Sequence, residues 1–390
     1  MIMTKRSPGQ ALPVFLAFLV MGFADAAGPF VGLAKQQFQL SNFAAQLIAF
    51  TGFIMFGIVS VPMGVLQDKK GKKFVLILGL STMLVGVLIP ALTGFSTFPA
   101  FLLTVLLLGA GATILQVAGN PLMRDVSPQG AYARNLSMGQ FVKAIGSLSG
   151  PLIPVIAARA FGLGWGVIFP VFSVAIAITL IAAATLRAGA GKPERAAATL
   201  GSCLGLLKNG FVAMMVLAIF VYVGAEVSVS ANIPLYLKER FAVDIEKMGL
   251  LGTGLFFLAL TIGRFSGGVV LRWMKPRTFL RITTVVGLVA LAGLFVPSKP
   301  IATVAFFVAG LGFANIFPLI FSMTVDRRPE DANALSGLLV MAIVGGAFLP
   351  PLMGVVSDAS GAVRTGFLVP MAAIAYITWV GFALRGREES

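Results

Sequence analysis

Long apolar stretches separated by short polar segments make up almost the whole chain. A helix needs about 20 mostly apolar residues to cross the ~30 Å hydrocarbon core of a bilayer. Roughly twelve stretches meet that length, and they lie at 11–34, 43–66, 74–93, 98–123, 135–158, 166–186, 210–237, 248–271, 278–296, 300–325, 333–356 and 365–384. Runs such as Phe74–Val87 are continuously apolar instead of alternating, which argues against a β-barrel. The pattern predicts an all-α membrane protein with twelve transmembrane helices.

Composition strengthens this prediction. The 390 residues are 58% hydrophobic and 11% charged, and a soluble chain of this length needs more charge to cover its surface. An apolar run also continues past the signal-peptide-like Ala24-Asp25-Ala26 to Leu33, so we expect the first helix to be retained.

The net charge of +15 is explained by topology and not by nucleic acid. If the N-terminus is cytoplasmic, most of the 29 lysines and arginines fall in cytoplasmic segments, as the positive-inside rule requires. We therefore expect a multi-pass protein of the inner (plasma) membrane with both termini in the cytoplasm. Membrane lipid is the expected partner of the basic loops, and nucleic acid is not.

Two absences limit the chemistry. The chain has no histidine and a single cysteine, Cys203, which excludes His-based catalytic triads, His-ligated metals and an internal disulfide. We expect no enzymatic activity, no metal site and no cofactor, and we expect a monomer.

The two halves of the sequence resemble each other at an offset near 200 residues. Thr51-Gly52-Phe53 matches Thr253-Gly254-Leu255, Gly109-Ala-Gly111 matches Gly310-Leu-Gly312, and the segment from Asn135 matches that from Asn333. We predict two pseudo-symmetric six-helix bundles, 1–186 and 210–390, joined by a cytoplasmic loop at 187–209. Parallel repeats of this kind place a substrate path between the halves, with the site near mid-membrane.

The loop after the second stretch reads Gly64-Val-Leu-Gln-Asp68-Lys-Lys-Gly71-Lys-Lys73. It resembles the G-x-x-x-D-x-x-G-[RK]-[RK] signature of the major facilitator superfamily. Gly64 permits close helix approach, Asp68 can meet a helix N-terminus or a basic group, and Gly71 makes the turn. The resemblance implies the major facilitator fold and a conformational role for Gly64, Asp68, Gly71 and Lys73.

Within that superfamily the chain is similar to the fucose:proton symporter family. The motifs are Asp25-Ala-Ala-Gly-Pro29, Leu115-Gln-Val-Ala-Gly-Asn120-Pro121, Tyr222-Val-Gly-Ala-Glu226, Gly263-Arg264-Phe265, Phe317-Pro318-Leu-Ile-Phe321-Ser322 and the segment Gly345–Asp358. The resemblance implies secondary active uptake of a sugar, driven by a proton or sodium gradient with alternating access.

Asp25 is the expected site of the coupling ion. It lies at mid-span among small residues, and an ionisable group at that depth marks a pathway. The resemblance assigns it the proton-carrying role. The structural alternative is a static partner for Lys143.

Gln116 and Asn120 share one helix stripe and are expected to bind substrate. Amides both donate to and accept from sugar hydroxyls. The proton symporter has a glutamate at the position of Gln116, so a second protonatable site is in doubt here. Interhelical amide contacts are the structural alternative.

Lys143 departs from the family, which has asparagine in the run that reads Gln140-Phe-Val-Lys143 here. A buried ammonium needs an anion, which Asp25, Glu226 or the substrate could supply. We include Gln140 and Lys143 among the substrate residues, and an acidic sugar is one hypothesis beside a neutral one.

The second half contributes Tyr222, Glu226 and Asn315 as expected substrate residues, whereas Arg264 is expected to be structural or gating. The rival function is an efflux antiporter for small apolar or cationic compounds. The signature loop permits that function, but the amides in the fourth and fifth stretches argue against it.

Overall fold

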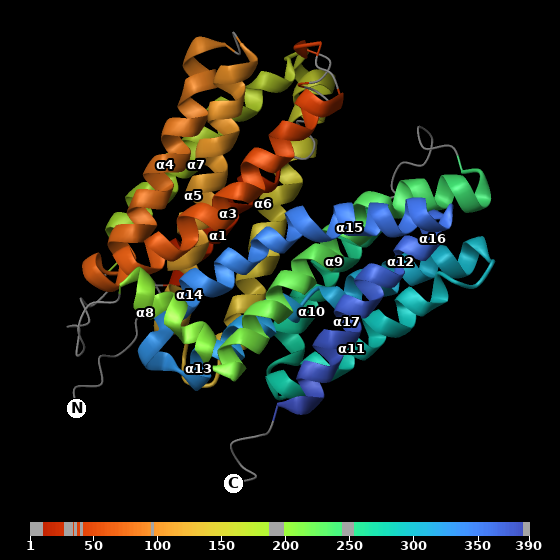
Figure 1. Ribbon diagram of the computed structural model, residues 1–390. Helices are drawn as coiled ribbons and strands as arrows, with labels where there is room; N and C mark the ends of the chain where they lie inside the picture. Colours follow the sequence, from red (N-terminus) through yellow and green to blue (C-terminus); the bar gives the residue numbers. More distant parts are fainter. Residues whose placement is uncertain are drawn as a thin grey trace. The chain divides into compact units, whose positions relative to one another are not determined.

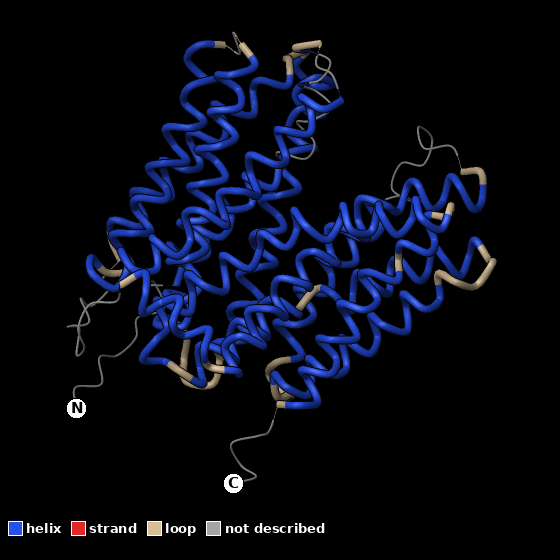
Figure 2. Tube along the Cα trace, viewed as in Figure 1, coloured by secondary structure: helices blue, strands red, loops and turns tan. Residues whose placement is uncertain are grey.

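The computed structural model describes residues 11–26, 34, 37–39, 42–94, 97–186, 199–243 and 253–384. All regular secondary structure within these ranges is helical (Figure 2). Eight helices among the described residues are long and apolar enough to cross a membrane, and two further apolar helices, Ala11–Ala24 and Ile168–Ala184, are shorter.

Within the described residues, the helices correspond to the stretches predicted from the sequence, and the predicted positions 27–33, 187–198 and 248–252 lie outside the described part. The first half holds α1 (Ala11–Met21), the 3-10 turn η2 (Gly22–Ala26), α3 (Asn42–Lys70), α4 (Lys72–Thr93), α5 (Phe98–Val126), α6 (Tyr132–Phe161) and α7 (Ile168–Ala184). The short α8 (Leu200–Gly205) follows, and then come α9 (Gly210–Phe241), α10 (Thr253–Val270), α11 (Pro276–Gly293), α12 (Lys299–Phe313), α13 (Ile316–Arg327), α14 (Ala332–Met341), α15 (Gly345–Ser360), α16 (Val363–Gly366) and α17 (Leu368–Ala383).

Two predicted helices are interrupted. The stretch 300–325 breaks at Asn315 between α12 and α13, because the ring nitrogen of Pro318 has no hydrogen to donate to the carbonyl of Ala314. The stretch 333–356 divides into α14 and α15 around the 3-10 turn Ala342–Val344, directly before Gly345-Gly346. Both breaks lie where the sequence carries a proline or paired glycines.

The chain forms two compact units. The first comprises Met1–Tyr132, Val142–Gly205 and Pro329–Met341, and the second comprises Ala133–Phe141, Leu206–Arg328 and Ala342–Ser390. The start of α6 thus belongs to the second unit, and α14 belongs to the first. These two segments are the ones that match at Asn135 and Asn333 in the sequence repeat. The division into bundles 1–186 and 210–390 stays a prediction.

In the first unit α5 packs against α3 and α4 (Figure 1), and glycines lie at these helix contacts. A Cβ on Gly109 would lie 2.9 Å from the carbonyl oxygen of Gly52, and one on Gly111 would lie 2.9 Å from that of Gly79. Without side chains at these positions the backbones approach closely, which is how small residues pack helices in membranes. The stacked rings of Phe23 and Phe172, 3.8 Å apart, fix η2 against α7.

The second unit repeats this packing with the corresponding residues. A Cβ on Gly310 would lie 2.6 Å from the carbonyl oxygen of Phe256, and one on Gly312 would lie 2.7 Å from the amide nitrogen of Gly287. In this unit α9 packs on α15 and α17, and α12 packs between α10 and α11. The repeated glycines of the sequence therefore serve the same packing function in both units.

Candidate functional site

Gln116 and Asn120 lie in the buried core of the first unit, on α5. Gln116 is 3% exposed and Asn120 is fully buried. Among the described residues, neither Gln116 Oε1 nor either side-chain atom of Asn120 has a hydrogen-bond partner. Buried polar atoms are nearly always paired, so such a cluster indicates a place where a polar ligand or water binds.

Pro121 lies inside α5, directly after these amides. A proline inside a helix cannot donate to the carbonyl four residues earlier, which here is that of Val117. Ser336 of α14 donates its hydroxyl to that carbonyl at 2.7 Å. The Tyr132 hydroxyl donates to the carbonyl of Asn120 at 3.1 Å. Side chains thus satisfy the backbone carbonyls around the amides, while Gln116 Oε1 and the Asn120 side chain stay available.

Lys143 lies on α6 where that helix approaches α1 and η2 closely. Any Cβ on Gly22 would collide with the carbonyl oxygen of Lys143, and any Cβ on Gly146 would collide with that of Leu19. The Lys143 side chain is half-buried. The backbone of Asp25 belongs to η2, three residues after Gly22, and its side chain lies outside the described part. The sequence elements that carry Asp25 and Lys143 are therefore neighbours in the first unit.

In the second unit, Glu226 on α9 pairs with Arg264 on α10. The Arg264 Nη2 to Glu226 Oε1 distance is 3.5 Å; the Arg264 side chain is 18% exposed and the Glu226 side chain 17%. Arg264 Nε has no partner among the described residues. The sequence did not reveal this pair, because 38 residues separate the two positions and no local spacing signals their contact.

Tyr222 and Asn315 lie in the same unit as this ion pair. Tyr222 is one turn before Glu226, is 2% exposed, and has a hydroxyl without a partner in the described structure. Asn315, 1% exposed at the break between α12 and α13, donates Nδ2 to the carbonyl of Gly263 at 2.7 Å, next to Arg264. Asn315 Oδ1 has no partner among the described residues. One side of Asn315 therefore fixes the backbone of α10, and the other can accept a hydrogen bond.

Gln140 belongs to the part of α6 that is in the second unit. It is 4% exposed, and its Nε2 has no partner among the described residues. The next residue, Phe141, packs its ring 5.3 Å from that of Phe265 on α10. Gln140, Tyr222, Glu226, Arg264 and Asn315 thus lie in one unit, and Asp25, Gln116, Asn120 and Lys143 in the other.

The signature loop joins α3 to α4 and contacts α14 within the first unit. Asn333 Nδ2 donates to Asp68 Oδ1 at 3.2 Å, and Gln67 Nε2 donates to Asn333 Oδ1 at 3.0 Å. Asp68 therefore accepts a hydrogen bond from a side-chain amide in the first turn of α14. A Cβ on Gly64 would lie 3.2 Å from the Cα of Gly337, so α3 and α14 approach closely there.

Gly71 and the lysines after it fix the turn into α4. Gly71 has φ +87°, a backbone conformation that other residues rarely adopt. The Lys73 ammonium donates to the carbonyls of Ala184 and Leu186 at 2.6 and 2.8 Å, at the end of α7. A cation there complements the C-terminal end of a helix. Lys72 pairs with Asp125 at 2.6 Å.

Cys203 connects α8 to the same region. Its buried Sγ donates to the carbonyl of Ala334 on α14 at 3.4 Å. Burial raises the pKa of the thiol to about 11, and the Asp68 carboxylate contributes in the same direction. The thiol is therefore neutral at physiological pH, and its role is to pack α8 against α14.

Sequence comparison identifies the protein family to which the chain belongs. The sequence matches the Major Facilitator Superfamily over residues 14–351. The chain belongs to the major facilitator superfamily. This membership confirms the predicted fold and the expectation of a multi-pass transporter and not an enzyme.

Individual relatives agree with this membership. The chain is 27% identical to the "Glucose/galactose transporter" of Brucella abortus biovar 1 (strain 9-941), over 97% of this chain and 95% of the relative. It is 24% identical to the "L-fucose-proton symporter" of Escherichia coli (strain K12), over 88% of this chain and 85% of the relative. These relatives confirm the resemblance to the fucose:proton symporter family.

A solved structure has the same fold. The crystal structure of the major facilitator transporter FucP in the outward conformation matches with a TM-score of 0.83 at 21% identity, over 97% of this chain and all of the other. At this identity the match establishes the fold alone.

Proposed function

We propose that this major facilitator protein imports a sugar or sugar derivative by cation-coupled symport with alternating access. The observation that carries the proposal is the pair of buried amides on α5: Gln116 Oε1 and both polar side-chain atoms of Asn120 lack hydrogen-bond partners among the described residues. Sugars offer many hydroxyls, and each can donate to an amide oxygen or accept from an amide nitrogen. Full-length relatives that are named as sugar transporters support the same assignment.

The proposed site continues on the second unit. Tyr222, Glu226 and Asn315 offer a hydroxyl, a carboxylate and an amide oxygen, and Gln140 offers an amide nitrogen. Mid-membrane sites between repeats are typical of secondary transporters, and rocking of one half against the other exposes them alternately. In this proposal the membrane is the inner membrane, with both termini in the cytoplasm.

Coupling is assigned to Asp25. A carboxylate can carry a proton or bind sodium, and two of the relatives are named as proton symporters. An ion-coupled carrier must bind ion and substrate with different affinities in its two states. Removing the charge of Asp25 therefore uncouples transport from the gradient without necessarily removing the sugar site.

The test is uptake into liposomes that contain the purified protein. With an imposed proton or sodium gradient, the wild-type protein is expected to accumulate a sugar, and Asp25→Asn is expected to lose accumulation while it retains exchange. The substrate and ion come from a preceding thermal-shift screen of neutral and acidic sugars, with and without sodium, at two pH values. Full accumulation by Asp25→Asn would remove this residue from coupling, and extrusion of apolar cations without any sugar flux would favour the efflux alternative.

The proposal also covers whether the sugar substrate is acidic or neutral. Lys143 is a half-buried ammonium at a position where the resembled family has a neutral side chain. An acidic sugar would supply a carboxylate for Lys143, and a neutral sugar would leave Lys143 to Asp25. We propose the acidic sugar as the first class to test.

A further inference from the structure

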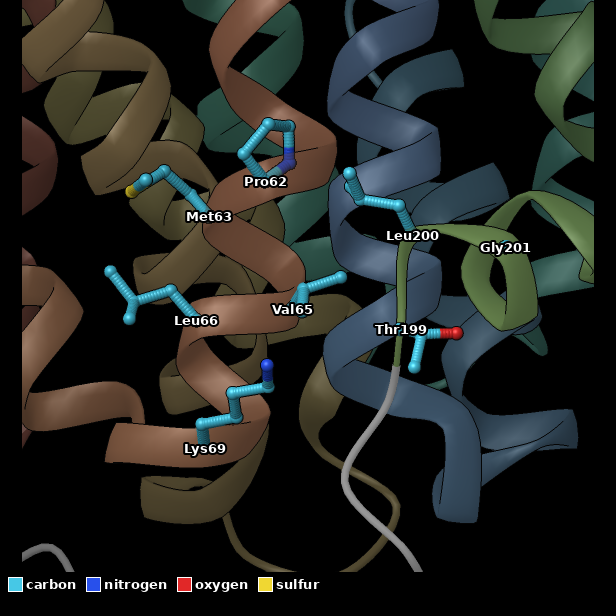
Figure 3. Close-up of a pocket in the computed structure, with 8 residues that line it drawn as sticks. All are labelled: Pro62, Met63, Val65, Leu66, Lys69, Thr199, Leu200 and Gly201. Atoms are coloured by element: carbon cyan, nitrogen blue, oxygen red, sulfur yellow. The ribbon is translucent and has the colours of Figure 1, made fainter.

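A groove lies between the last turns of α3 and the short helix α8. It has a volume of about 590 Å³ and is lined by Pro62, Met63, Val65, Leu66, Lys69, Thr199, Leu200 and Gly201 (Figure 3). Its volume is within the ~300–1,000 Å³ that is usual for small-molecule sites. Figure 3 shows the α3 side chains on one side and Thr199, Leu200 and Gly201 on the other. All of these residues belong to the first unit.

The groove exists because of how α8 is fixed. Cys203 turns its side chain into the protein, toward Ala334, so the opposite part of α8 does not enter the core. Leu200 is 52% exposed and Leu204 is 46% exposed. Gly201 has no side chain, and a Cβ there would approach only Thr199 Oγ1, at 3.9 Å. The groove therefore stays open along α3, and its lining there is apolar.

A positively charged side chain, that of Lys69, lies at one end of this groove. Of the four lysines in the signature loop, Lys72 is paired with Asp125 and Lys73 with helix carbonyls. No carboxylate or carbonyl pairs with Lys69 among the described residues, and its side chain is exposed. The neighbouring Asp68 bonds to Asn333 instead. Lys69 is thus a positive charge that is open to a ligand.

We propose that this groove binds an anionic phospholipid, with an acyl chain along Met63, Leu66 and Leu200 and the headgroup phosphate at the Lys69 ammonium. Apolar lining suits the acyl chain, since each buried methylene contributes about 0.8 kcal/mol. The unpaired ammonium complements a phosphate, and basic segments beside transmembrane helices attract anionic lipid. The lipid would join α3 to α8, a part of the interdomain loop that packs on this helix.

Native mass spectrometry of the full-length protein with phosphatidylglycerol and phosphatidylcholine tests the proposal. The wild-type protein is expected to retain phosphatidylglycerol in preference. Lys69→Gln is expected to weaken that binding about fivefold, the effect of one lysine near an anionic surface. Lys70→Gln is the matched control, because Lys70 is exposed but does not line the groove.

A second variant tests the apolar part without changing charge. Gly201→Phe is expected to fill the groove and remove phosphatidylglycerol binding, whereas Gly205→Phe, on the same helix with open space around it, is expected to keep it. Equal binding of the two lipids, or equal losses in Lys69→Gln and Lys70→Gln, would overturn the proposal. Competition by free glycerol phosphate as strong as by the lipid would mean that the site binds a phosphate only. These readouts do not depend on transport, so they are independent of the sugar proposal.

Discussion

Charged residues within the membrane-spanning helices have different surroundings in the two units. Glu226 and Arg264 neutralise each other from neighbouring helices of the second unit. Lys143 is placed by glycine contacts with the first helix, on a backbone that adjoins the turn carrying Asp25. An isolated charge in hydrocarbon is costly, so each of these charged side chains needs a partner. The identity of that partner decides whether the side chain is structural or binds substrate.

Lys143→Asn tests whether the substrate is acidic. If the lysine binds a substrate carboxylate, the variant is expected to lose at least about thirtyfold in affinity for acidic sugars, since removing one partner of a buried pair costs about 2 kcal/mol or more. Affinity for neutral sugars should change little. The measurement is competition against uptake of a labelled substrate. Unchanged uptake together with full competition by neutral sugars would contradict the acidic-sugar hypothesis.

A double-mutant cycle tests the Glu226–Arg264 pair. Glu226→Gln and Arg264→Gln are each expected to lower the thermal stability, because each leaves a partly buried charge alone. The double variant should be more stable than the sum of the single losses predicts, with a coupling of about 0.5–3 kcal/mol. The exposed pair Lys72–Asp125 is the control and should couple by about 1 kcal/mol or less. Strict additivity at Glu226 and Arg264 would mean that the pair does not stabilise the fold.

At the scale of elements, proline residues determine where backbone hydrogen bonds of the helices are missing, and glycine residues determine where neighbouring helices pack closely. Pro121 frees a carbonyl that Ser336 then binds, and Pro318 lies in the first turn of α13, directly after the break that follows α12. Gly64 and Gly337 bring α3 and α14 together beside the Gln67–Asn333–Asp68 hydrogen bonds. Polar contacts and close packing thus coincide at one junction of the first unit.

Gly337→Val is expected to disturb this junction. A Cβ at Gly337 would lie 3.0 Å from the carbonyl oxygen of Ser60 and 3.3 Å from the Cα of Gly64, so α3 and α14 must separate. Overpacking of this kind costs about 1–3 kcal/mol, measured as a lower unfolding temperature of the solubilised protein. Gly354→Val is the control, because a Cβ at Gly354 has nothing within 4 Å. Equal stability of the two variants would show that the contact is not tight.

At the scale of the whole molecule, the distribution of basic residues predicts orientation. Fusions of a reporter that is active only in the cytoplasm should be active at both termini and in the 187–209 loop. Moving the lysines of the 69–73 loop to the opposite side of the membrane should weaken this preference, since lysine and arginine bias sets topology. A second reporter, one that works only outside the cytoplasm, should be inactive at both termini. Its activity at either terminus would contradict the predicted topology.

The sequence by itself determined the fold, because twelve apolar stretches and a repeated set of glycines leave few alternatives for a chain in a bilayer. It also determined the candidate site residues Gln116, Asn120 and Asn315, since polar side chains within apolar stretches are rare and conspicuous. Gly71 was predictable for a local reason, because its turn requires positive φ.

Only the tertiary structure decided which of these residues meet. The Glu226–Arg264 pair, the Ser336 bond to the Val117 carbonyl and the Asn333 bond to Asp68 join positions 38, 219 and 265 residues apart. Such contacts depend on how helices pack and rotate about their axes, and apolar periodicity in a membrane protein constrains that rotation weakly because lipid and core are both apolar. The groove between α3 and α8 has the same origin, since it results from the docking of Cys203 and not from any local motif.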